Sequence, residues 1–213
     1  MKTVTVIDYG MSNLRSVSKA LEHVADNDWQ VIISNEANVI IEADKIVFPG
    51  QGAIGNCMDL LKQTGIATAI EQVLAYKKPF LGICLGMQTL LTNSEENGGI
   101  TGFNWTAGTV RNFDKLLDLN SSDNLKIPHM GWNRVQQVQN HPLWFNIANG
   151  SRFYFVHSYY ADPLDNTVVA GTTSYGNLNF VSVIAQDNVF AVQFHPEKSQ
   201  QVGLTLLKNF LNW

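Results

Sequence analysis

Residues 82–86 place a cysteine between two glycines, with the spacing of a nucleophile on a strand-turn-helix elbow. The run is Gly-Ile-Cys-Leu-Gly, with Cys84 at its centre. In such an elbow the nucleophile occupies a strained turn, and side chains two residues away would collide. The sulfur lies at the start of the next helix, whose dipole favours a thiolate, and the Leu85 N–H points at any oxyanion that forms. A buried core cysteine in a tight turn fits these five residues equally well.

A thiolate nucleophile needs a general base, and His195 with Glu197 is the best candidate among the five histidines. Residues two apart lie on the same side of an extended backbone, so the Glu197 carboxylate can hold the imidazole in one tautomer. Pro196 stiffens the segment. The pattern also fits a strand-end histidine that is simply capped by a glutamate. A metal pair is disfavoured because no further cluster of ligand spacing accompanies the two residues.

The other four histidines are predicted to have no catalytic role. His23 lies on the polar side of an amphipathic segment, and His141 precedes a proline in a turn. His129 and His157 lie among apolar and aromatic residues, which indicates structural histidines that could line a pocket.

Residues 49–52, Pro-Gly-Gln-Gly, follow a strand-like run and contain two glycines. Such a turn can present backbone N–H groups to an anion or to a developing oxyanion. It lacks the lysine and Ser/Thr of a phosphate loop and the glycine pattern of a dinucleotide site. By itself it fits a plain tight turn as well.

The elements that position these residues alternate between strand and helix in the first half of the chain. Ser12 is a candidate N-cap for an amphipathic helix to residue 25, and a further helix is predicted at 66–76. Short strands separated by turns dominate the second half, and a helix closes it at 200–211. We predict one α/β domain over residues 1–213, an open, mostly parallel, flavodoxin-like sheet with helices on both faces. Antiparallel strands extend it in the C-terminal half. The predicted strands are residues 3–8, 29–34, 44–48, 80–83, 106–113, 132–138, 152–160, 167–174, 179–185 and 189–194.

The composition limits the kinds of binding partner that we expect for the protein and the cellular compartment in which we expect it. The 213 residues are 45% hydrophobic and 15% charged, with a net charge of -4, which gives no indication of a nucleic-acid or membrane partner. Two cysteines are too few for a disulfide framework, and the N-terminal residues lack a signal-peptide core, so we expect a reduced cytoplasmic protein. Cys57 has no flanking glycine elbow and is predicted to be a packing residue. No cofactor or metal is expected.

Taken together and in this order, "PGQG", "GICLGMQ" and "FHPEKS" resemble the class I, or triad, glutamine amidotransferases over essentially the whole chain. The resemblance implies that Cys84 attacks the carboxamide of L-glutamine, with His195 as base and Glu197 as its orienter. It implies oxyanion donors at Leu85 and around Gln51 and Gly52. It also implies a glutamine site made by Gly50, Gln88, Glu96, Ser158 and Tyr159, where the Glu96 carboxylate suits an α-ammonium group.

Further stretches, "VIDYGMSNLRSV", "IPHMGWNRV" and "FYFVHSYY", resemble those members that act as separate glutaminase subunits in histidine biosynthesis. This implies a heterodimer with a (β/α)₈-barrel cyclase, through which ammonia passes to the acceptor. Trp, Tyr and Arg are typical of interface hot spots, although Trp132 and Tyr154 also fit core positions. The positions that match the docking face are Asn13, Arg15, Trp132, Tyr154 and Lys198.

Three departures from the usual pattern keep alternatives open. Ser12 and Gln51 replace a common glycine and valine, and the stretch around Glu96 is unusually polar. One alternative is a paralogous subunit that donates ammonia to nucleotide sugars in surface-polysaccharide synthesis. A second is a cysteine hydrolase or peptidase on a similar fold, which leaves Gln88 and the Pro-Gly-Gln-Gly turn unexplained. A third is a non-catalytic scaffold for a barrel partner.

Overall fold

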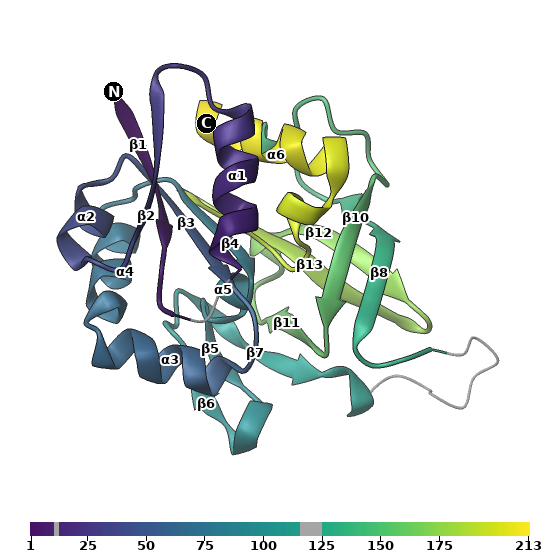
Figure 1. The fold of residues 1–213 in the computed structure, drawn as a ribbon. Helices are drawn as coiled ribbons and strands as arrows, with labels where there is room; N and C mark the ends of the chain where they lie inside the picture. The colour runs from purple at the N-terminus through teal and green to yellow at the C-terminus, as the bar shows by residue number, and fades with distance from the viewer. Residues whose placement is uncertain (11–12, 116–124) are drawn as a thin grey trace.

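The computed structural model describes residues 1–10, 13–115 and 125–213, and its centre is a large twisted sheet (Figure 1). Ser12, the predicted N-cap, lies outside these residues. Within them the sheet has 12 strands, and its main path runs β2-β1-β3-β4-β14-β13-β11-β7-β5-β6. Strands β2, β1, β3, β4 and β14 run parallel to one another, and β14 is antiparallel to β13 on its other side. The predicted α/β class, with a parallel part followed by antiparallel strands, is confirmed.

The three helices that were predicted by residue range lie close to those positions, whereas α2 and α3 were not predicted. The helix predicted at 66–76 is α4, and the one predicted at 200–211 is α6. No helix among the described residues is both long and apolar enough to cross a bilayer. The helices are α1 Leu14–Val24, α2 Ala37–Glu42, α3 Ile54–Gln63, α4 Ile66–Ala75, α5 Leu85–Gln88 and α6 Gln200–Asn212, and two 3₁₀ turns used below are η1 Glu96–Gly98 and η5 Pro196–Lys198.

The central strands β3 and β4 are buried on both faces, which explains why they are nearly continuous apolar runs rather than alternating ones. All six residues of β3, for example, are buried. The first seven strands are β1 Lys2–Ile7, β2 Trp29–Ser34, β3 Lys45–Gly50, β4 Phe80–Cys84, β5 Leu91–Ser94, β6 Ile100–Thr101 and β7 Thr106–Asn112. The others are β8 His129–Arg134, β9 Gln136–Gln137, β10 Arg152–His157, β11 Tyr159–Pro163, β12 Val169–Tyr175, β13 Leu178–Gln186 and β14 Val189–Val192.

Two apolar layers cover the sheet. One layer packs α1 and α6 against it, through residues such as Leu21 and Phe210. The other packs α3 and α4 against the opposite face, through residues such as Met58 and Ile70. Both faces of the parallel strands are therefore sealed, and the site must lie at a strand end rather than on a face.

The strand predicted at 152–160 is two strands in two different sheets. It breaks at Ser158: β10 pairs with β8 in a separate two-stranded ribbon, while β11 joins the main sheet beside β7. The prediction that all the later strands extend the main sheet was therefore wrong for β8 and β10. Alternation of apolar residues fixes which side of a strand is buried but does not identify its neighbour.

Candidate active site

Cys84 ends β4 in a strained turn, as the glycine spacing predicted. Its backbone has φ 54° and ψ −106°, in a region that residues other than glycine rarely adopt. A Cβ on Gly86 would lie 2.0 Å from the Phe48 carbonyl oxygen, and one on Gly82 would lie 2.9 Å from the Gly86 oxygen. Both flanking glycines are therefore required by close backbone contacts. The helix that follows, α5, is only one turn long, so its dipole is weaker than that of a full helix.

We expect Gly86→Ala to lower the free energy of unfolding by about 3 kcal/mol or more, because a backbone carbonyl cannot move aside for the added methyl group. Urea denaturation followed by circular dichroism measures the change. Gly55→Ala in α3 is the matched control: its Cβ would meet the end of the Ile100 side chain at 3.2 Å, and alanine favours a helix. Equal stability of the two variants would contradict the steric explanation.

His195 and Glu197 form the hydrogen-bonded pair that the sequence predicted. His195 Nδ1 lies 2.9 Å from Glu197 Oε1, and both side chains are almost completely buried. Because a carboxylate only accepts, Nδ1 carries a proton. Nε2 has no hydrogen-bond partner among the described residues and is the atom left for proton transfer. Burial lowers the pKa of His195, but the Cys84 sulfur and the Glu197 carboxylate raise it by more than burial lowers it, to about 10. The arrangement favours an imidazolium at His195, beside the Cys84 sulfur.

The turn that holds the pair is fixed by backbone contacts to the ribbon. The His195 N–H donates to the Tyr154 carbonyl at 2.9 Å. The Ser199 hydroxyl donates to the His195 carbonyl at 2.6 Å and accepts from the Tyr154 N–H at 3.0 Å. Ser199 is fully buried, and it was not among the predicted site residues.

A pocket of about 300 Å³ brings the predicted residues together at the carboxyl ends of the parallel strands. Gly50 and Glu197 do not line it. Gly50 pairs with Cys84 in the sheet, and Glu197 lies behind His195. Predicted residues that line the pocket are Gln51, Gly52, Cys84, Leu85, Gln88, Glu96, Ser158, Tyr159 and His195, joined by Pro128, Val156 and His157.

Hydrogen bonds fix several of the lining groups. Glu96 Oε2 accepts from the Ile54 N–H at 3.0 Å, so the carboxylate is held at the start of α3. Gln88 is buried and its Nε2 donates to the Tyr159 carbonyl at 3.1 Å. Its Oε1 accepts no hydrogen bond from the described residues and can therefore accept one from a ligand. A carboxylate, a carboxamide oxygen and a thiol around one small pocket suit a polar amide substrate.

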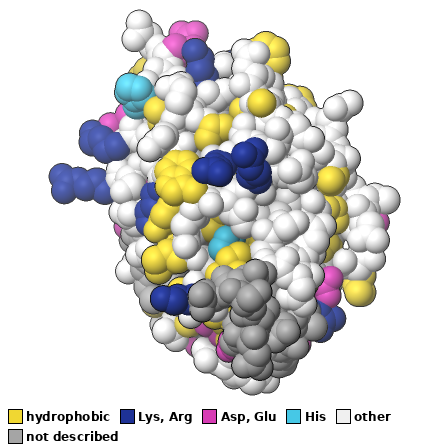
Figure 2. All heavy atoms as spheres, turned by 90° about the vertical axis from the view of Figure 1, so that its right-hand side faces the viewer, with side chains coloured by type: hydrophobic (Ala, Val, Ile, Leu, Met, Phe, Trp, Pro, Cys, Tyr) yellow, Lys and Arg dark blue, Asp and Glu magenta, His cyan; other side chains and the backbone are white. Residues whose placement is uncertain are grey.

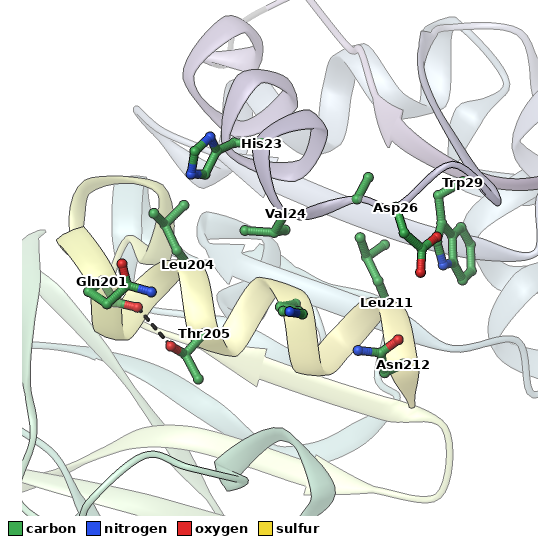
Figure 3. Close-up of a pocket in the computed structure, with 11 residues that line it drawn as sticks. His23, Val24, Asp26, Trp29, Gln201, Leu204, Thr205, Leu211 and Asn212 are labelled. Carbon is green, nitrogen blue, oxygen red and sulfur yellow. Dashed lines mark hydrogen bonds between the residues drawn. The ribbon is translucent and has the colours of Figure 1, made fainter.

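A larger hollow, of about 450 Å³, lies between the end of α1 and α6, but it carries no such chemistry (Figure 3). Leu204 and Leu211 line it beside exposed polar groups, and the Thr205 hydroxyl bonds the Gln201 carbonyl within its own helix. None of the predicted site residues lines this hollow. Among the described residues, no group of three His, Cys, Asp or Glu side chains has the arrangement of a metal site.

Three of the five predicted interface residues form a cluster beside the pocket. The rings of Trp132 and Tyr154 meet edge to face at 6.2 Å, and Lys198 Nζ lies 5.9 Å from the Tyr154 ring centre. Trp132 is 43% exposed, which excludes the core position that its sequence also fitted. Arg15 and Asn13 are exposed at the start of α1, an element that contacts η5. Figure 2 shows the face that carries the ribbon, where hydrophobic and basic side chains lie next to each other.

Comparison with known proteins agrees with this geometry. The family model "Glutamine amidotransferase class-I" matches residues 5–213. Imidazole glycerol phosphate synthase subunit HisH of Hydrogenovibrio crunogenus is 54% identical over 100% of this chain and 97% of its own length. The HisH subunit of Pseudomonas syringae pv. syringae is 51% identical, with 100% and 98% coverage.

Solved structures share the fold at much lower identity. PurLQS of Thermotoga maritima has a TM-score of 0.69 at 19% identity, and covers 99% of this chain and 98% of its own. The glutaminase domain of Trypanosoma brucei CTPS has a TM-score of 0.62 at 15% identity, with 100% and 94% coverage. On the full-length sequence matches, the chain belongs to the class I glutamine amidotransferases and, within them, to the HisH subunits of imidazole glycerol phosphate synthase.

Proposed function

We propose that the chain is the glutaminase subunit of an imidazole glycerol phosphate synthase, and that it hydrolyses L-glutamine to glutamate and ammonia for a cyclase subunit in histidine biosynthesis. The observation that carries this proposal is that Cys84 and His195 line one pocket, while Glu197 is hydrogen-bonded to His195 from behind. The full-length similarity to HisH subunits supports the pathway. The experiments below distinguish this function from two alternatives, ammonia donation to nucleotide sugars and a non-catalytic scaffold.

The geometry supports a two-step acyl transfer. The Cys84 thiolate attacks the side-chain carbonyl carbon of glutamine, and the oxygen becomes an oxyanion held by the Leu85 N–H and by N–H groups of Gln51 and Gly52. The carbon–nitrogen bond breaks as His195 Nε2 gives its proton to the leaving nitrogen, which departs as ammonia. Water, deprotonated by the same Nε2, then attacks the thioester. Glutamate leaves and the thiolate is restored.

Glu96 is assigned to the α-ammonium group of glutamine, with Gln88 and the backbone at Ser158 and Tyr159 completing the site. We expect Glu96→Gln to raise KM for glutamine about 10- to 100-fold with little change in kcat, because one charge-assisted hydrogen bond far from the reacting carbon is lost. Steady-state glutamate release measures both constants.

Glu95→Gln is the matched control for Glu96→Gln. The neighbouring carboxylate pairs with Arg111 Nη1 at 3.5 Å and does not line the pocket, so KM should stay within about twofold of wild type. A KM that rises equally in both variants would place the effect in the charge of the loop and not in a direct contact.

The proposed docking face comprises Trp132, Tyr154 and Lys198 on the ribbon and η5, with Asn13 and Arg15 at the start of α1. Its occupant is the cyclase subunit, for which we propose a (β/α)₈ barrel. An exposed tryptophan in contact with a tyrosine is typical of an interface centre.

The partner is expected to switch the glutaminase on, because the turn at residues 49–52 must present an N–H to the oxyanion. Supplying one such donor raises the rate by about 10²- to 10³-fold. Glutamate release would be measured for the chain alone, with the cyclase, and with the cyclase and its ribonucleotide. Stimulation of this size supports the histidine pathway. Activity that ignores this partner favours a nucleotide-sugar paralogue or a stand-alone hydrolase, and no activity in any mixture favours a scaffold.

A further inference from the structure

Gln193 is a buried carboxamide beside the nucleophile that has no part in the triad. It follows β14 directly, and β14 runs parallel to β4 with Val192 level with Ile83. Gln193 therefore comes level with Cys84 at the shared edge of the sheet. Its exposed fraction is 0%, and its Nε2 lies 3.5 Å from Cys84 Sγ. A polar side chain at such a position needs a fixed set of hydrogen-bond partners.

The neighbouring carboxamide fixes which end of Gln193 faces the sulfur. Gln88 Nε2 lies 3.0 Å from Gln193 Oε1 and 3.1 Å from the Tyr159 carbonyl oxygen. Because that carbonyl can only accept, the Gln88 atom is the donor nitrogen, and the Gln193 atom that it meets is an oxygen. The NH₂ group of Gln193 then has to point at Cys84.

Two buried histidines fix the Tyr159 carbonyl from the other side. His157 Nδ1 lies 2.7 Å from the Tyr159 oxygen and so carries a proton, and its Nε2 accepts from His129 Nδ1 at 2.9 Å. His129 Nε2 in turn accepts from Asn133 Nδ2 at 3.2 Å. Burial lowers the pKa of both histidines, to about 4 for His129 and about 3 for His157. Both rings are therefore neutral, and each hydrogen bond in the series from Asn133 to the Tyr159 carbonyl has only one possible donor.

We propose that Gln193 is a further catalytic residue, whose carboxamide donates a hydrogen bond to the Cys84 thiolate and holds it ionised in the resting enzyme. The proposal rests on the proposed glutaminase function. Donation from a neutral amide stabilises the anionic sulfur over the thiol. Within the described part of the chain, the titratable groups His195 and Tyr9 interact electrostatically with the same sulfur. The Gln193 amide adds a donor whose strength does not change with pH.

Two variants test the proposal. Gln193→Glu keeps an oxygen for Gln88 to bond and removes the donor at the sulfur, and Gln193→Met removes both groups while keeping an unbranched chain. The probe is iodoacetamide, and the rate of Cys84 alkylation is followed by mass spectrometry across pH, without glutamine or any partner. Thr173→Val is the matched control, because its buried hydroxyl bonds only the Ser182 hydroxyl, at 2.9 Å.

In both Gln193 variants the pH of half-maximal alkylation should rise, and the rate at neutral pH should fall about tenfold or more. At high pH the variants should react as fast as wild type or faster, because a thiolate without a hydrogen bond is the better nucleophile. The kcat/KM for glutamine should fall about 10- to 100-fold. A merely structural role lowers alkylation at every pH instead.

The inference is overturned if either folded variant keeps the wild-type alkylation profile and the wild-type kcat/KM. If one variant does not fold, the other decides. Wild-type glutamine hydrolysis is measured in parallel, so that failure of the proposed function is visible separately: an inactive wild type with a normal alkylation profile refutes the glutaminase and leaves the thiolate contact standing.

Discussion

Cys84→Ser should lower kcat for glutamine hydrolysis by about 10⁴-fold or more, to the rate of a protein without its nucleophile. A serine hydroxyl is not ionised near neutral pH, and the His195 imidazolium has a proton to give but no capacity to take one. The remaining oxyanion donors cannot form an acyl intermediate. Glutamate release in the presence of the cyclase and its ribonucleotide, where the wild-type rate is highest, measures the loss.

The second cysteine provides the control. Cys57 is buried in α3, does not line the pocket, and burial raises its pKa to about 12. Cys57→Ala should therefore keep glutaminase activity within a few-fold of wild type. Residual hydrolysis in Cys84→Ser within tenfold of wild type would remove the nucleophile from the mechanism. A glutamine-induced rise in Tm that survives in Cys84→Ser would show that the pocket is intact.

Glu197→Gln should lower kcat by about 10³- to 10⁴-fold, since the same exchange in a serine-histidine-aspartate triad leaves the imidazole in the wrong tautomer. Here the carboxylate accepts from Nδ1 at 2.9 Å, and an amide placed there can turn its NH₂ group toward the ring. Nδ1 would then lose its proton and Nε2 would hold one permanently. Nε2 must give a proton to the leaving nitrogen and later take one from water. It therefore has to alternate between its protonated and unprotonated forms.

The same variant has a pH signature with a definite sign. Burial lowers the pKa of His195, while Cys84 and then Glu197 raise it, to a net value of about 10. Without the Glu197 charge the pKa of His195 should fall, so the imidazolium is lost at a lower pH. The alkaline limb of the kcat/KM profile should therefore shift to lower pH. NMR titration of the His195 ring measures the pKa directly. An unchanged pKa would show that the Glu197 carboxylate does not stabilise the positive charge on His195. Glu71→Gln, an exposed change on α4, should leave both readings unaltered.

The elbow and the histidine pair could be predicted from the sequence because both depend on local geometry. The collision at Gly82 is with the Gly86 backbone inside the turn, although the one at Gly86 is with Phe48 on β3. Residues 195 and 197 share a side by the period of the extended chain. Their meeting in one pocket follows from the parallel strand ends, which the strand-helix alternation indicated.

Other parts depend on neighbours that no local pattern identifies. The ribbon β8-β10 alternates like the antiparallel strand β7 of the main sheet, so its separate pairing could not be predicted. Gln193 left a weak signal, a carboxamide inside the apolar run Val-Phe-Ala-Val-Gln-Phe. Its role depends on contacts with residues 105 to 109 positions away in the chain.

The backbone of Cys84 has a consequence for the thermal stability of the whole fold. Its conformation costs about 1–3 kcal/mol for any residue with a side chain, and the neighbouring strands β3 and β14 hold it in place from both sides. A glycine at this position would relieve that strain and give a more stable, inactive protein. Selection for heat resistance alone would therefore act against the nucleophile, so that the sulfur persists only while its chemistry is needed.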